Sequence, residues 1–301
     1  MTIDSNKTIS LVLGSGGARG LAHIGVIREL EANGYKIGAI SGCSIGALVG
    51  GIYAAGKLDE LEKWICAISR MDMVSLLDLS WGRSGLVKGD KFIDALVDLV
   101  GNQLIEELPI PFTAIATDIE NEKEIWINSG SLFAAIRASI SLPLFFTPVR
   151  YKQTHLIDGG VLNPVPIAPT FDDDTDITVA VNLGGPYDRA LKEKVNEEPP
   201  AAELSPFRKK IKLYIDKMRT DDGDDNVEKD WGVYDVANMA FDAMQSTIAR
   251  QKLAAYPPDV VIEIPRNACG TLEFDRASEM IELGRATAHK CIVQSEKHAP
   301  A

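Results

Sequence analysis

Residues 37–55 read IGAISGCSIGALVGGIYAA and contain a strand, a sharp turn and a helix in immediate succession. Ile37–Ile40 is a short apolar run, as in a buried strand, and Ile45–Ala55 is rich in Ala, Gly and Leu and predicts a helix. The turn Gly42-Cys43-Ser44-Ile45-Gly46 fits G-x-S-x-G, whose glycines prevent collisions with neighbouring elements. We predict that Ser44 is a nucleophile, raised above the sheet edge at a helix N-terminus. The alternative is a tight turn in which Ser44 only caps the helix.

A second strand, turn and helix precede these residues. Ile9–Leu13 is wholly apolar, Gly14–Gly20 (GSGGARG) follows, and apolar residues then recur at helical spacing as far as Gly34. Two such units in succession predict an α/β fold, in which helices cover an open sheet.

The glycine-rich segment Gly14–Gly20 admits several interpretations. A dinucleotide-binding loop is disfavoured, because Arg19 stands where the third glycine belongs and no acidic residue ends the next strand. A Walker loop needs Gly-Lys-Ser/Thr, which is missing. The segment is then either an oxyanion hole, built from converging backbone N–H groups, or an ordinary tight turn. A second special turn on the neighbouring strand favours the oxyanion hole, with Arg19 holding the loop or adding positive potential.

The rest of the chain continues the α/β pattern. Further strands are predicted at Phe112–Thr117, Ile125–Ile127, His155–Ile157, Ile177–Leu183 and Val260–Ile264. Further helices are predicted at Asp90–Val100, Leu132–Ala138, Trp231–Ala254 and Ala277–Gln294. We interpret residues 8–170 as a catalytic core and 171–301 as its continuation in the same domain. A flexible excursion is expected at 190–230, which is rich in Glu, Pro and Asp.

A serine nucleophile ordinarily has a histidine base. The chain has four histidines, which are His23, His155, His289 and His298. His23 is interpreted as a packed or solvated residue of the first helix and His298 lies in the tail, which leaves two formal candidates.

Asp158 is a better candidate for the base. The stretch Leu156-Ile157-Asp158-Gly159-Gly160 places a carboxylate at the end of an apolar strand, with two glycines that leave space beside it. A buried carboxylate with a raised pKa can accept a serine proton directly. The alternatives are an ordinary Asp-Gly turn and Asp118, which ends another strand without glycine neighbours and is interpreted as structural.

Composition excludes several classes of function. With a net charge of −12, the chain is not expected to bind nucleic acid, which requires a basic surface. No apolar run reaches the roughly 18 residues of a transmembrane helix, and the N-terminus lacks the features of a signal peptide. Four separated cysteines without a CxxC pair suggest neither a zinc site nor a disulfide framework. We therefore expect reduced thiols and a cytoplasmic location.

Three motifs stand in order: the glycine loop Gly14–Gly20, the elbow Gly42–Gly46 and Asp158-Gly159-Gly160. Together they resemble the patatin-like phospholipase family, its bacterial members in particular. The segments Trp81–Leu86, Ser139–Pro143 and Phe145–Pro148 are also similar to that family. One departure is Ser15, where many members have glycine.

The resemblance implies a three-layer α/β/α patatin-like fold with a mainly parallel central sheet. It implies a Ser44–Asp158 dyad and an oxyanion hole made by the Gly16, Gly17 and Ala18 N–H groups next to Arg19. It also implies hydrolysis of a lipid or fatty-acyl ester without a metal or organic cofactor. The apolar residues expected near the site, either as an acyl pocket or simply as core, are Leu142, Leu144, Phe145, Phe146 and Val161.

Two other functions remain open at this level. One is acyl transfer to another acceptor, and the other is a regulatory protein whose site is catalytically silent. A basic amphipathic stretch at Phe207–Arg219 predicts either transient contact with a membrane surface or an ordinary surface helix.

Overall fold

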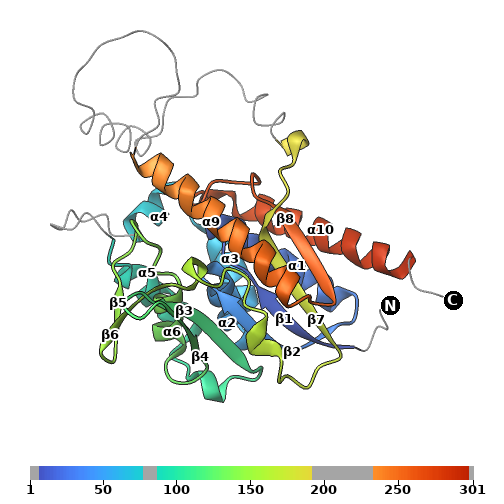
Figure 1. The fold of residues 1–301 in the computed structure, drawn as a ribbon, viewed down its shortest axis with the longest axis horizontal. Coiled ribbons are helices and arrows are strands. Elements are labelled where there is room, and N and C mark those ends of the chain that lie inside the picture. Colours follow the sequence, from blue (N-terminus) through green and yellow to red (C-terminus); the bar gives the residue numbers. More distant parts are fainter. Residues whose placement is uncertain (1–6, 77–86, 192–232, 298–301) are drawn as a thin grey trace, which may run out of the picture.

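The computed structural model describes residues 7–76, 87–191 and 233–297. The described elements form an α/β fold around one sheet (Figure 1). Its strands are β1 (Thr8–Leu13), β2 (Lys36–Cys43), β3 (Phe112–Asp118), β4 (Lys123–Ile127), β5 (Val149–Tyr151), β6 (Thr154–Asp158), β7 (Ile177–Gly185) and β8 (Val260–Pro265). The α-helices are α1 (Ala22–Ala32), α2 (Ile45–Ala54), α3 (Leu58–Ala67), α4 (Arg70–Leu76), α5 (Asp90–Val100), α6 (Leu132–Ser139), α9 (Val233–Ala255) and α10 (Ala277–Lys297). Short 3₁₀ turns are η1 (Gly17–Leu21), η2 (Ile105–Glu107), η3 (Gly159–Val161), η4 (Ala168–Thr170) and η5 (Phe274–Arg276).

The sheet is mainly parallel, as predicted. Its order is β5-β6-β3-β2-β1-β7-β8, with β4 paired to β3. The strands β3, β2, β1, β7 and β8 run parallel to one another, whereas β4, β5 and β6 are antiparallel to their neighbours. Strands from both halves of the chain thus share one sheet.

Alternating residues of the central strands face two different apolar layers. Leu11 and Leu13 of β1 belong to the large cluster that includes α1, α2 and α10. Val12 of β1 and Ala180 of β7 belong to a smaller cluster with Ala249 of α9. Since successive strand residues point to opposite faces, helices cover the sheet on both sides, and Figure 1 shows α9 crossing one of them. The predicted three-layer α/β/α fold is confirmed.

The predicted strands and helices are found, with several corrections at their ends. The strand predicted at Ile37–Ile40 continues to Cys43, since a strand that leads directly into the elbow has no intervening loop. Part of the glycine segment forms the 3₁₀ turn η1. The helices α3 and α4 and the strand β5 were not predicted.

Three segments named from the sequence lie wholly or mostly beyond the described residues. The amphipathic stretch Phe207–Arg219 and nearly all of the excursion predicted at 190–230 lie outside the described residues, as does Trp81–Leu86. Within the described residues, no helix combines the length and hydrophobicity needed to cross a bilayer.

Candidate active site

The predicted elbow has the geometry that its sequence requires. Ser44 follows β2 and is the N-cap of α2, with φ 55° and ψ −123°, a strained conformation for a residue with a side chain. A Cβ atom on Gly46 would lie 2.1 Å from the carbonyl oxygen of Leu13, and one on Gly42 would lie 2.5 Å from that of Gly46. Only glycine fits at these two positions, and the backbone between them presents the Ser44 side chain at the sheet edge.

Strand register brings Asp158 to the same edge. Both β2 and β4 pair with Ala114 and Ile115 of β3, so they occupy opposite edges of that strand. Both β4 and β6 pair with residues 116–118, so β6 lies on the same edge as β2, beyond its end. Cys43 is opposite Ile115, and Asp158 is opposite the next residue of β3. The last residue of β6 therefore lies beside the residue that follows β2.

Ser44 and Asp158 are in direct contact. The Ser44 hydroxyl donates to Asp158 Oδ2 over 2.5 Å, and the Gly160 N–H donates to Asp158 Oδ1 over 2.7 Å. Asp158 is fully buried. Burial raises the pKa of Asp158 from 3.8 to about 6, although the hydrogen bonds from Ser44 and Gly160 act in the opposite direction. At neutral pH this carboxylate is ionised and unusually basic.

The raised pKa predicts a stability change on removing the charge. The folded-state pKa of Asp158 exceeds its unfolded value, so proton binding by Asp158 stabilises the folded state. This contribution to the free energy of unfolding is complete below pH 3.8 and is lost as the pH rises through 6. Asn imitates the neutral carboxyl at every pH. We expect Asp158→Asn to raise the free energy of unfolding by about 3 kcal/mol at pH 7.5 and about 1 kcal/mol at pH 4.5. Urea unfolding at both values measures this, and an equal change at both would contradict it.

The other candidate bases, Asp118, His155 and His289, form contacts with residues other than Ser44. Asp118 accepts hydrogen bonds from Thr154 (2.5 Å) and Asn121 (2.8 Å), which hold its pKa below the ordinary value. His155 and His289 lie on the surface, where each contacts a glutamate, Glu120 and Glu29 respectively.

The remaining histidines are also accounted for. His23 is fully buried on α1, and its Nε2 donates to the Gly14 carbonyl oxygen over 2.9 Å. Burial lowers the pKa of His23 to about 4, so its ring is neutral at pH 7 and supports the glycine loop. His298 lies outside the described residues.

The glycine loop supplies fewer free donors than predicted. The Ala18 N–H donates to the Thr271 carbonyl oxygen over 2.9 Å, because the turn between β8 and α10 packs onto the loop. Ala18 is therefore not available to an oxyanion in this structure, which corrects the prediction for that residue. Gly16 and Gly17 are the predicted donors that are left, and Gly17 lines the cavity next to Ser44.

The Arg19 side chain contacts the parts of the chain that follow β7. Its guanidinium is buried and donates to the Arg266 carbonyl oxygen (3.2 Å) and to Asp242 (3.4 Å). Arg19 was interpreted as either holding the glycine loop or adding positive potential to the site. These contacts favour the first interpretation.

Two supporting side chains were not identified from the sequence. Ser139, at the end of α6, accepts a hydrogen bond from the Ser44 N–H (2.8 Å) and donates to the Ile115 carbonyl oxygen (2.5 Å). Arg137 donates to Ser141 Oγ (2.7 Å) and to Thr147, and its guanidinium lies over the Phe146 ring. Ser139 thus holds the elbow, and Arg137 holds the segment that follows α6. The signal in the sequence is the presence of Arg137 and Ser139 within an otherwise apolar stretch, residues 132–140.

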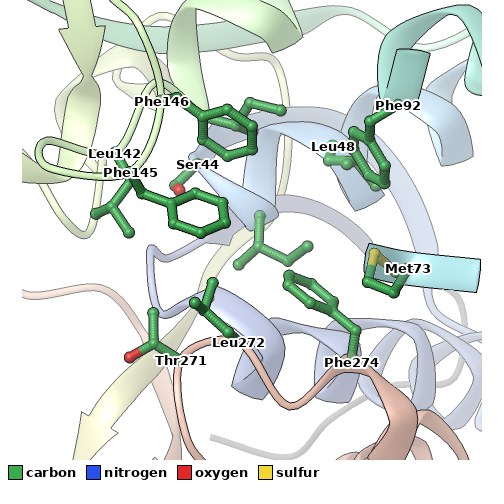
Figure 2. A pocket seen from close by; sticks show the side chains of 13 residues that line it. Ser44, Leu48, Met73, Phe92, Leu142, Phe145, Phe146, Thr271, Leu272 and Phe274 are labelled. Atoms are coloured by element: carbon green, nitrogen blue, oxygen red, sulfur yellow. The ribbon is translucent and has the colours of Figure 1, made fainter. Parts of the chain in front are cut away.

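An apolar cavity of about 60 Å³ begins at Ser44 (Figure 2). Of the apolar residues predicted near the site, Leu142, Phe145 and Phe146 line it. Leu144 does not, since it is 59% exposed, and Val161 lies in η3 rather than in the cavity wall. Within the described residues, no group of three or more His, Cys, Asp or Glu side chains is arranged to hold a metal ion.

The chain is similar to several known proteins. A family model described as patatin-like phospholipase matches residues 11–171. An NTE family protein of Mycobacterium tuberculosis is 38% identical and aligns over 96% of this chain and 92% of that protein. Lysophospholipase NTE1 of Debaryomyces hansenii is 33% identical over 62% of this chain and 12% of its own length. Among solved structures, VipD from Legionella pneumophila aligns over 97% of this chain and 68% of that chain, with 14% identity and a TM-score of 0.49. Because the family model spans more than half of the chain and a relative of similar length aligns throughout, the chain belongs to the patatin-like phospholipase family.

Proposed function

We propose that this chain hydrolyses carboxylic esters of lipids, with Ser44 as the nucleophile and Asp158 as its base. The observation that carries the proposal is the 2.5 Å hydrogen bond from the Ser44 hydroxyl to a fully buried carboxylate. With a pKa of about 6, Asp158 is ionised at neutral pH and still basic enough to take a proton. The family, and relatives named as lysophospholipases, support a lipid ester as the substrate.

The proposed reaction has two halves. Ser44 Oγ attacks the ester carbonyl carbon while Asp158 Oδ2 takes the hydroxyl proton. The N–H groups of Gly16 and Gly17 stabilise the charge that develops on the carbonyl oxygen. Asp158 returns the proton to the departing alkoxide, the alcohol leaves, and the acyl group remains on Ser44. Water then gives a proton to Asp158 and attacks the acyl carbon, and Ser44 recovers its proton as the carboxylic acid leaves. None of these steps calls for a cofactor.

The surroundings of Ser44 hold its hydroxyl in position for the proposed reaction. The contact between Ser139 and the Ser44 N–H fixes the strained backbone, so the hydroxyl keeps its direction toward Asp158. The N-terminus of α2 follows Ser44 directly and favours negative charge nearby. Both features stabilise the transition state without rearrangement.

A fluorophosphonate probe tests the proposal. Wild type and His155→Ala are expected to be labelled and to hydrolyse short aryl esters, whereas Ser44→Ala does neither. His155→Ala is the matched control, because it removes the nearest surface histidine on the strand that carries Asp158. A folded wild type that is neither labelled nor active would overturn the proposal in favour of a silent regulatory protein. An acyl product formed on added glycerol in place of free acid would identify an acyltransferase.

A further inference from the structure

The cavity at Ser44 ends against a wall built from three separate parts of the chain. Figure 2 shows Ser44, Leu142 and Phe145 on one side and Met73 and Phe92 on the other, with Phe274 below them. Met73 lies on α4, Phe92 on α5, and Phe274 in the turn of residues 266–276 between β8 and α10, which we call the β8–α10 turn. Met73 and Phe92 lie within the residues that the family model matches, and Phe274 lies beyond them.

The residues of the wall are held in place. Met73 is 6% exposed and Phe92 is 7% exposed, and the Phe92 ring lies 6.1 Å from that of Trp64. Such close packing leaves Phe92 little room to turn aside.

The β8–α10 turn is stiffened by its own hydrogen bonds. The Glu273 N–H donates to the Gly270 carbonyl oxygen, and the Gly270 N–H donates to the Glu273 carboxylate over 2.9 Å. Arg276 forms an ion pair with the same carboxylate at 3.0 Å. The Ala18 N–H binds the Thr271 carbonyl oxygen and fastens the turn to the glycine loop. Phe274 is thus carried by a braced turn that is tied to the loop beside Ser44.

The space in front of this wall is small. A cavity of 150 Å³ holds benzene, a ring of six carbons. At about 60 Å³, the cavity beside Ser44 holds about two to three carbons on the same scale. Its lining is almost wholly apolar, so the group it accepts is an alkyl chain and not a polar head group.

We infer that Met73 and Phe274 close the cavity after a short acyl chain and so determine which acyl group Ser44 accepts. This inference rests on the proposed function. The part of the acyl group that this cavity holds is short, and any longer or bulkier portion of the substrate stays outside the cavity.

A series of p-nitrophenyl esters from acetate to laurate tests the wall. For wild type, kcat/KM is expected to peak at about four carbons, the carbonyl carbon included, and to fall at least tenfold by eight. In Met73→Ala and Phe274→Ala the optimum moves to longer chains, with a gain of about fourfold for each additional buried methylene. Met71→Ala is the matched control, because Met71 lies two residues away on the same helix but is 73% exposed. A wild type that prefers eight or more carbons, or unchanged profiles in both variants, would overturn the inference.

A second experiment measures the length of the cavity by ligand binding, without catalysis. Ser44→Ala is titrated with 1-alkanols from ethanol to octanol, and binding is followed by ligand-observed NMR. The affinity is expected to stop rising after about three carbons and to continue rising in Ser44→Ala/Phe274→Ala. A plateau with an inactive wild type would refute the proposed hydrolysis and leave the wall intact. Active wild type without a plateau would refute the wall alone.

Discussion

Asp158→Asn is expected to lower kcat for ester hydrolysis by about 10²- to 10⁴-fold, the range that a positioned general base contributes. The amide fills the same volume and its one oxygen can accept a hydrogen bond from either the Gly160 N–H or the Ser44 hydroxyl, but it cannot take the proton. The variant is expected to fold and, from the pKa of about 6, to be more stable than wild type at neutral pH. Loss of activity in a more stable protein would separate a chemical effect from a structural one.

Asp118→Asn provides the matched control. Asp118 also ends a strand of the same sheet, but its carboxylate is bonded to Thr154, Asn121 and nearby backbone N–H groups rather than to Ser44. Its replacement is expected to reduce stability while kcat stays within about tenfold of wild type. An Asp158→Asn enzyme that keeps more than a tenth of the activity would contradict the role of that residue. So would an equal loss in both variants.

The double variant Ser44→Ala/Asp158→Asn is expected to be no less active than Ser44→Ala alone. Without the Ser44 hydroxyl there is no proton for Asp158 to accept, so the two losses do not multiply, as in other catalytic units. Ser44→Ala itself is expected to lose about 10⁴-fold or more in kcat. The measurement is kcat for all four proteins of the cycle on one aryl ester. Two losses that multiply would show that Ser44 and Asp158 act independently and would refute the dyad.

The parts of the site that local sequence determines were predictable. The elbow follows from Gly42, Ser44 and Gly46, because backbone atoms lie where side chains of the two glycines would be. The strands other than β5 and the helices α5, α9 and α10 follow from apolar runs and periodicity. Even α3 was recoverable, since its buried residues Leu58, Leu61 and Ile65 recur at helical spacing.

The parts that depend on tertiary contacts were not predictable. Asp158 meets Ser44 only because β2 and β6 share one edge of β3, and pairing register is not visible in the residues. Ser139 contacts a backbone group 95 residues away. Ala18 looked like an oxyanion donor because nothing in its own segment shows that Thr271 will accept its N–H.

The most direct test of the central claim, that a carboxylate and not a histidine is the base, is the pH dependence of kcat/KM. It is measured for wild type and for a variant in which His155, His289 and His298 are replaced by Gln. The fourth histidine, His23, is buried with a pKa of about 4 and does not titrate near neutrality. The proposal predicts that kcat/KM rises with pH through about 6 in both proteins, as Asp158 loses its proton. Loss of this rise, or of activity, in the folded histidine variant would contradict it.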